Sequence, residues 1–213
     1  MVNSPLPTNL GAECRKAAKT LNSFIDPNSA EAGPDSVIPP DILARAKGLA
    51  IFTVVKAGFL FSGRAGSGIV IARLPDGTWS APSGIATGGM GFGGQIGAEM
   101  TDFVVVLNSR DAVKAFSHGG NVTLGGNLSV AAGPIGRNAE AAGTVGNLAA
   151  IFSYSKTRGL FAGVSIEGSV IVERRDANAK FYGRTVSAKE LLSGGVPPPP
   201  QADALYAALA SRA

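Results

Sequence analysis

Two stretches of alternating apolar and small residues, 100 positions apart, dominate the hydrophobic pattern of this chain. Residues 50–76 and 150–176 align without a gap and share 11 of 27 residues, whereas average composition would give roughly two. β-Branched and aromatic runs broken by glycine are typical of strands. The pattern therefore predicts a β unit that occurs twice, with its copies related by a pseudo-two-fold axis.

The repeated unit also predicts the fold class and the core. We expect an α+β fold in which an antiparallel barrel or sandwich, built from the duplicated unit, is covered by short helices. The shared Gly63 and Gly163 are expected to permit close backbone approach or a positive φ. The following apolar residues of the two copies are expected to be buried together: Phe52, Leu60, Phe61, Val70, Ile71, Phe152, Leu160, Phe161, Val170 and Ile171.

Each copy is expected to continue into a turn. Residues 74–77 read Leu-Pro-Asp-Gly, with proline and glycine where a β-turn needs them. Residues 69–73 and 78–80 are therefore predicted to form a hairpin. The second copy is predicted to turn near residues 176–178 and to return as a strand through 180–182.

The segment between the copies carries further strand signals. Glycines alternate through residues 84–97, and residues 101–107 read TDFVVVL, so both segments are predicted strands. Residues 89–94 also fit the dinucleotide pattern G-x-G-x-x-G. We do not interpret them as a nucleotide site, because the strand, loop and helix context is missing and glycine is abundant here.

Helical spacing marks both ends of the chain. Apolar residues recur every three or four positions through residues 10–25 with basic residues off that face, which predicts a basic amphipathic helix. Such a helix either covers its own core or lies on a membrane or a partner protein. Leu205 and Leu209 share a face in a predicted helical tail that follows the polyproline residues 197–200. Shorter helices are predicted over residues 42–47, 109–116 and 187–193, and Ser109 and Ser187 are the predicted amino-terminal caps of the last two.

These elements suggest one domain that spans residues 1–213. Residues 1–26 form its amino-terminal helix, residues 38–196 form the duplicated β core, and residues 197–213 form the proline-rich segment and the carboxy-terminal helix.

Charge is sparse and unevenly placed. The net charge is +4, and only 16% of the residues are charged, well below the usual quarter. A stretch from residue 42 to 75 has no acidic residue. A basic surface attracts nucleic acid, anionic lipid or an acidic protein filament, although a solvated face explains any single residue equally well. Nucleic acid is not predicted as a partner, because the aromatic residues lie at core-like strand positions. The basic residues of this stretch are Arg45, Lys47, Lys56, Arg64 and Arg73.

The sequence offers no recognisable catalytic or metal-binding pattern. The lone His118 has no sequence partner, and Cys14 lies on the apolar face of a predicted helix, where packing is its expected role. Carboxylates such as Glu99 and Asp102 would form an acid–base pair only with a separation and a pKa that sequence does not supply. We therefore predict a binding module and not an enzyme, with no cofactor and no metal. The single cysteine and the absence of a leader peptide predict an intracellular protein without a membrane span.

Five motifs spread over the chain carry a family resemblance. They are IPPDILARAKGLAIF (38–52), KAGFLFSGRAGSGIVIARLPDGTWSAPS (56–83), TDFVVVLNSRDAVKAF (101–116), GGNLSVAAGPIGRNAEA (125–141) and YSKTRGLFAGVSIEGSVIVERRDANAKFYG (154–183). Together they resemble the SYLF domain, most closely its form in fungal cortical actin-patch proteins. The resemblance implies a module that binds filamentous actin (F-actin) and phosphoinositide or other anionic lipids in endocytosis and cortical actin organisation. It implies a cytoplasmic protein at the cell cortex and actin patches, peripherally associated with membrane.

The resemblance also implies site residues. In this family the amino-terminal amphipathic helix is implicated in phosphoinositide binding, and in fungal members the basic amino-terminal segment is also implicated in actin binding. The matching residues are Arg15, Lys16 and Lys19, and the five basic residues between 42 and 75 are the next candidates. Fungal members usually continue into an SH3 domain. Residues 197–200 are a candidate SH3 ligand, although a spacer that lays the tail across the domain is favoured.

A second hypothesis belongs to a different class. The chain would then be a lipid carrier or sensor that holds an acyl chain in its β core, with actin binding incidental. Only a carrier would retain a stoichiometric lipid when it is extracted from cells, so mass spectrometry of the extracted protein distinguishes the two.

Overall fold

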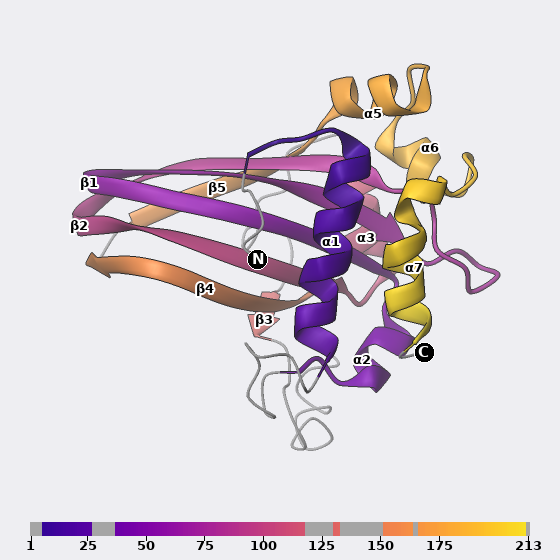
Figure 1. The fold of residues 1–213 in the computed structure, drawn as a ribbon, viewed down its shortest axis with the longest axis horizontal. Helices are drawn as coiled ribbons and strands as arrows, with labels where there is room; N and C mark the ends of the chain where they lie inside the picture. Colours follow the sequence, from indigo (N-terminus) through magenta and orange to yellow (C-terminus); the bar gives the residue numbers. More distant parts are fainter. Residues whose placement is uncertain (1–5, 27–36, 118–129, 133–150, 164–165, 212–213) are drawn as a thin grey trace.

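The computed structural model describes residues 6–26, 37–117, 130–132, 151–163 and 166–211. Long strands extend away from a group of helices at one end of the molecule (Figure 1). The mixture of helix and strand confirms the predicted α+β class. The elements are, in chain order, α1 (Leu10–Ile25), α2 (Pro40–Arg45), β1 (Gly48–Ala72), β2 (Ser83–Leu107), α3 (Arg110–Ser117), β3 (Val130–Ala132), β4 (Ile151–Gly163), β5 (Ile166–Glu173), α5 (Arg175–Tyr182), α6 (Ala188–Leu192), the 3₁₀ turn η2 (Pro200–Ala202) and α7 (Asp203–Ala210).

Local sequence signals place the predicted caps and the first turn correctly. Ser109 and Ser187 each accept a hydrogen bond of 3.1 Å from the backbone N–H three residues further on, and so cap α3 and α6. The backbone N–H of Leu74 donates to Thr78 at 2.8 Å, and Gly77 takes a φ of 87° that favours glycine. The hairpin predicted after β1 is therefore confirmed.

The central strand of the sheet is β2. It runs antiparallel to β1 along their whole length, from the pair Gly48 and Leu107 to the pair Val70 and Ser83. On its other edge the second half of β2 pairs with β4, and the first half pairs with β5. The short β3 runs parallel to the start of β4.

The two halves of β1 fold back against each other at Leu60. The register with β2 shifts between Phe59 and Phe61, and Leu60 has a φ of 60°. A Cβ built on Gly68 would lie 2.5 Å from Phe52 Cα, so the backbone of the second half lies directly on that of the first. Side chains at such positions would keep the two halves apart, which is why glycine recurs here.

The sheet buries apolar side chains on both of its faces. One face packs against α1, α2 and α7, and it buries Ile51, Val104 and Phe152. The other face is closed by α3 and α6, and it buries Phe52 and Val105. Alternation along each strand divides these residues between the faces.

The predicted barrel is wrong, because the sheet is not closed. Both β4 and β5 pair with β2, and no ladder among the described strands joins β1 to either of them. Closure would require the outer edge of β1 to pair with the outer edge of β4 or β5.

The duplicated unit does not give two equivalent halves. Both copies form strands antiparallel to β2, but Phe52 and Phe152 are buried on opposite faces. The strand predicted at 180–182 is wrong, because residues 175–182 form the helix α5. This segment lacks the Pro-Asp-Gly turn of the first copy, and its apolar residues at helical spacing pack on α1 and on the core. The pseudo-two-fold axis is thus not shown.

Two further core predictions fail at the bend of β1. Leu60 and Phe61 are 52% and 75% exposed, because the strands extend past the helices that bury the rest of the sheet. A Cβ on Gly63 would meet nothing within 4 Å, and the φ of Gly63 is not positive, so this glycine is not needed for close approach. The side chains of Leu160 and Phe161 lie outside the described residues.

Candidate functional site

The first candidate surface is the polar face of α1. Asn9 caps this helix by accepting a hydrogen bond of 2.9 Å from the backbone of Ala12, and the apolar face of the helix is buried on the sheet. Arg15 and Lys19 are exposed to solvent. Lys16 is not part of this exposed surface, because its side chain is only 15% accessible.

Lys16 belongs to a buried ionic network around Glu13. Lys16 Nζ lies 2.9 Å from Glu13 Oε2, and Arg174 Nη1 lies 3.5 Å from Glu13 Oε1. Thr8 and Ser67 donate hydrogen bonds of 2.8 to 2.9 Å to the same Oε1. A buried carboxylate needs such partners to offset its desolvation. We therefore assign Lys16 to the attachment of α1 to β1 and not to ligand contact.

Two other predicted site residues also make structural contacts. The Arg73 guanidinium donates to the carbonyl oxygens of Leu43, Ala46 and Gly77 at 3.0 to 3.3 Å and lies 4.4 Å from the centre of the Trp79 ring. Burial lowers the pKa of Arg73. Arg45 forms an exposed ion pair of 2.7 Å with Asp41 within α2. Such surface pairs contribute little to stability.

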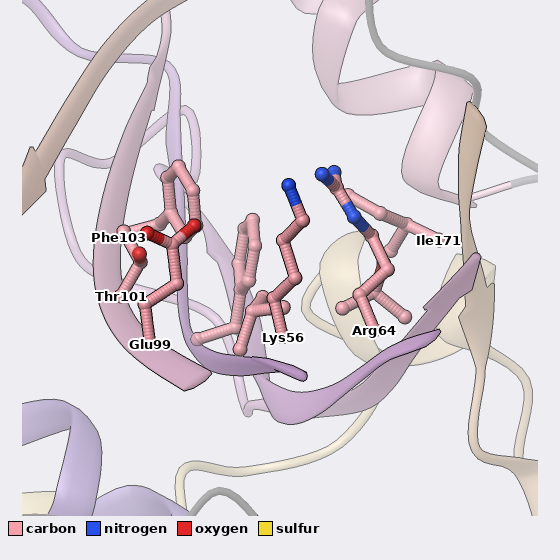
Figure 2. A pocket seen from close by; sticks show the side chains of 9 residues that line it. Lys56, Arg64, Glu99, Thr101, Phe103 and Ile171 are labelled. Atoms are coloured by element: carbon pink, nitrogen blue, oxygen red, sulfur yellow. The ribbon is translucent and has the colours of Figure 1, made fainter. Parts of the chain in front are cut away.

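Lys56 and Arg64 come together in a charged pocket on the concave side of the bent sheet. The pocket has a volume of about 200 Å³, and Phe52 stacks on Phe103 beside it with ring centres 5.1 Å apart. Figure 2 shows Lys56 and Arg64 side by side, with Glu99 on the strand next to Lys56. Its lining residues are Phe52, Val54, Lys56, Arg64, Thr87, Glu99, Thr101, Phe103 and Ile171.

The pocket partly neutralises its own charges. Lys56 and Glu99 are directly opposite in the register of β1 and β2, a cross-strand position that favours opposite charges. Burial lowers the pKa values of both Lys56 and Arg64, and Glu99 acts in the opposite direction on each. Sequence reasoning found the two cations but missed Glu99 as their partner, because that pairing depends on strand register.

The remaining predicted residue, Lys47, lies in a basic groove between the end of β1, the following turn, α3 and α6. The groove has a volume of about 590 Å³. Among the described residues that line it, five are basic and none is acidic, although Asp111 lies nearby and pairs with Lys114 at 3.3 Å. The basic residues of the groove are Lys47, Arg73, Arg110, Lys114 and Lys189, and its apolar lining is Ala72, Leu74, Pro75, Val113 and Leu192.

Sequence analysis missed three of these basic residues. Arg110, Lys114 and Lys189 lie outside the acid-free stretch that was singled out. They join Lys47 because α3 and α6 both pack on one face of the sheet, where Phe116 and Leu192 are buried in the same cluster. These three residues could have been found from the sequence as basic residues at exposed positions of the predicted helices.

The described segments bring several cations together at the surface. In them, no group of three or more His, Cys, Asp or Glu side chains is arranged to hold a metal ion. None of the helices that the structure describes is long and apolar enough to span a membrane. The geometry instead provides cations that can contact phosphate or carboxylate groups.

Comparison with known proteins identifies the family. The family model described as "Ysc84: Las17-binding protein actin regulator" matches residues 88–212. The yeast (Saccharomyces cerevisiae) proteins named LAS seventeen-binding protein 3 and Protein YSC84 are 62% and 61% identical over 214 residues, which cover 100% of this chain and 46% of each relative. The human SH3 domain-containing YSC84-like protein 1 is 54% identical over 210 residues, which cover 99% of this chain and 61% of the relative.

No solved structure matches the chain. The chain spans about half the length of the yeast relatives that it matches. The comparisons confirm the resemblance to fungal SYLF proteins. Since the matched residues 88–212 make up more than half of its 213 residues, this chain belongs to the Ysc84 family of actin regulators.

Proposed function

We propose that this chain binds filamentous actin and anionic phosphoinositide membranes, and that it acts in endocytosis and cortical actin organisation. It would work in the cytoplasm at the cell cortex and actin patches, peripherally associated with membrane. The observation that carries this proposal is the basic groove. The names of the family model and the yeast relatives refer to Las17 binding, and we propose that the protein containing this chain has the same kind of partner.

The groove has the chemistry that an acidic protein filament needs. Five cations line the groove, and the nearby carboxylate of Asp111 pairs with one of them, Lys114. The remaining excess of positive charge creates a potential that steers and orients an acidic surface. The apolar lining includes Leu74 and Leu192, and apolar side chains of a partner can be buried against it. We propose that this groove contacts the acidic surface of actin.

The exposed residues of α1 support the membrane part of the proposal. Arg15 and Lys19 are accessible to phosphate groups, and each basic residue near an anionic leaflet contributes about 1 kcal/mol of binding free energy. This attraction is electrostatic, because the apolar face of α1 is occupied by the core. The polyproline residues 197–200 are exposed at Pro197, Pro198 and Pro200 and stay a candidate SH3 ligand.

The pocket favours this proposal over a lipid carrier. Its volume of about 200 Å³ is below the range of roughly 300 to 1,000 Å³ that small-molecule sites occupy. Lys56, Arg64 and Glu99 line it, and burying these charges against an acyl chain without water would be costly.

The test is cosedimentation with actin filaments and with vesicles that contain phosphoinositide. The variant Lys47→Glu/Lys189→Glu reverses two exposed groove charges that lie outside the Arg73 contacts. It is expected to weaken filament binding about 30-fold or more, since each lost attraction is worth about 1 kcal/mol and repulsion adds to it. The variant Arg15→Glu/Lys19→Glu is expected to weaken vesicle binding in the same way.

Lys180→Glu is the matched control. Lys180 is exposed on α5 and does not line the groove, so its reversal changes net charge as much as either groove substitution alone. The control is compared with the single variant Lys47→Glu. An equal loss of filament binding in these two variants would contradict a local site. Circular dichroism checks that every variant folds.

A further inference from the structure

The bend of the sheet exposes a group of large apolar side chains. Phe59, Leu60, Phe61, Met90 and Ile96, which we call the tip, are between 52% and 83% exposed. Strand register holds them together, because Phe59 is opposite Ile96 and Met90 is opposite Gly63. The bend forms the end of the sheet that is farthest from the helices (Figure 1). We propose that the tip inserts into the interface of an anionic lipid bilayer.

At the tip, a residue with a strained backbone conformation carries an exposed apolar side chain. Leu60 has a φ of 60°, in the left-handed region where glycine is favoured and other residues are strained. Gly58 permits the reversal, because a Cβ there would lie 2.5 Å from Ser62 Cα. A leucine at this position combines an unfavourable backbone conformation with an exposed apolar side chain, which points to a role in contact with a partner.

The distribution of charge around the tip favours a bilayer as that partner. Residues 57–63 and 85–98 contain no charged side chain, so these segments of β1 and β2 can leave water without desolvating a charge of their own. On the neighbouring strand β5, the acidic residue Glu167 is opposite Gly91 in the register. The first charged residues of β1 behind the tip, Lys56 and Arg64, are both basic, with Glu99 as their acidic neighbour on β2. Along β1, an uncharged apolar end followed by basic residues matches the order of acyl chains and anionic headgroups in a leaflet.

The shape of the tip and the packing of α1 point the same way. A protruding end suits a fluid interface, whereas a protein groove would have to enclose it on several sides. The apolar face of α1, which otherwise resembles a membrane-binding helix, is already buried against the sheet through Leu21 and Phe24. Outside the tip, the large exposed apolar side chains of the described residues are Leu6 and Val172, so the tip is the main apolar surface that can enter lipid.

This inference rests on the membrane part of the proposed function, and one experiment tests it directly. Phe61→Trp places an indole at the tip, and its emission is measured with vesicles of phosphatidylserine and brominated phosphatidylcholine. We expect a blue shift and quenching by the brominated lipid. The native Trp79 provides the control. It forms an isolated β-bridge with Arg73 beyond the opposite end of β1, so the emission of the wild type is expected to stay unquenched.

The outcomes separate the tip from the proposed function. Vesicle cosedimentation of the Phe61→Trp protein without quenching would overturn insertion alone. If neither this protein nor the wild type cosediments with these vesicles or with phosphoinositide vesicles, the membrane part of the proposed function fails together with the tip. Filament binding is expected to be unchanged in both proteins.

Loss of the apolar side chains provides an independent measurement. Phe61→Ser/Met90→Ser is expected to weaken vesicle partitioning about a hundredfold, because each of the two fully buried apolar side chains contributes about tenfold. Val172→Ser, at an exposed valine on β5, is expected to change partitioning by less than about twofold. A different outcome would be a dimeric wild type and a monomeric double variant that partition equally into vesicles. The tip would then be a self-association surface, and the proposal would be wrong.

Leu60→Gly separates function from stability at the same place. Glycine adopts the left-handed φ of this position without strain, so the melting midpoint is expected to stay the same or rise. Vesicle partitioning is expected to fall, because an apolar side chain is lost. Unchanged partitioning in this variant would contradict a role of Leu60 in lipid contact.

Discussion

Gly68 lies directly against Phe52: a Cβ built on Gly68 would be 2.5 Å from Phe52 Cα. This contact joins the two halves of β1, so a methyl group there must push backbone from backbone. Gly68→Ala is expected to lower the free energy of unfolding by about 1 to 3 kcal/mol, as other overpacking substitutions do. Urea unfolding monitored by circular dichroism measures the change.

Gly63 provides the matched control on the same strand. A Cβ on Gly63 would meet nothing within 4 Å, so Gly63→Ala is expected to change the unfolding free energy by less than about 1 kcal/mol, or to raise it by reducing the entropy of the unfolded chain. Equal losses at Gly63 and Gly68 would contradict the fold-back of β1.

The ionic network around Glu13 is expected to hold α1 on the sheet. Glu13→Ala leaves Lys16 and Arg174 without their buried counter-ion and is expected to cost about 3 to 5 kcal/mol. Asp111→Ala removes an exposed ion pair with Lys114 and is expected to cost less than about 1 kcal/mol. Thermal unfolding of the two variants checks the difference, and equal midpoints would show that the Glu13 network adds no stability.

Because the thiol of Cys14 is buried, the free energy of unfolding is expected to fall as the pH rises into the alkaline range. Burial raises the pKa of Cys14 from 9.0 to about 12, so the folded chain holds this proton after the unfolded chain has lost it. The contribution of the protonated Cys14 thiol to the free energy of unfolding is complete below pH 9 and is lost as the pH rises toward 12. The free energy of unfolding of the wild type is therefore expected to fall more steeply over this interval than that of Cys14→Ala.

Urea titrations at several pH values measure these two slopes. Equal slopes for the wild type and Cys14→Ala would contradict the raised pKa. As a second check, a thiol reagent at pH 8 is expected to modify Cys14 only when the chain is unfolded, because the thiolate is the reactive form.

Local signals in the sequence predicted the elements well but not their arrangement. Capping by Ser109 and Ser187, and the turn at residues 74–77, depend on neighbouring residues, so sequence reasoning found them. The helix α5 was missed because identity between the copies was extended past Asp176, where the local turn signal had ended. The bend at Leu60 has no glycine or proline at the residue that turns, so the exposed tip was placed in the core.

The site shows the same limit. Arg15 and Lys19 were recognised from helical spacing, and their exposure agrees with that pattern. Lys16 and Arg73 belong to the same sequence clusters, yet both are held by structural partners. Lys16 pairs with the buried Glu13 one turn away, and Arg73 donates to carbonyl oxygens of Leu43 and Ala46. The groove depends on the packing of α3 beside α6 and was therefore not predictable from charge patterning alone.

The most direct test of the central claim is lysine footprinting of the chain bound to actin filaments. Lys47, Lys114 and Lys189 line the groove, whereas Lys180 lies outside it, and mass spectrometry reads the acetylation rate of each in one sample. We expect filaments to protect the three groove lysines, to leave Lys180 unchanged, and to lose this protection at high salt. Filament-bound protein in which the groove lysines react as fast as they do in solution would contradict the account.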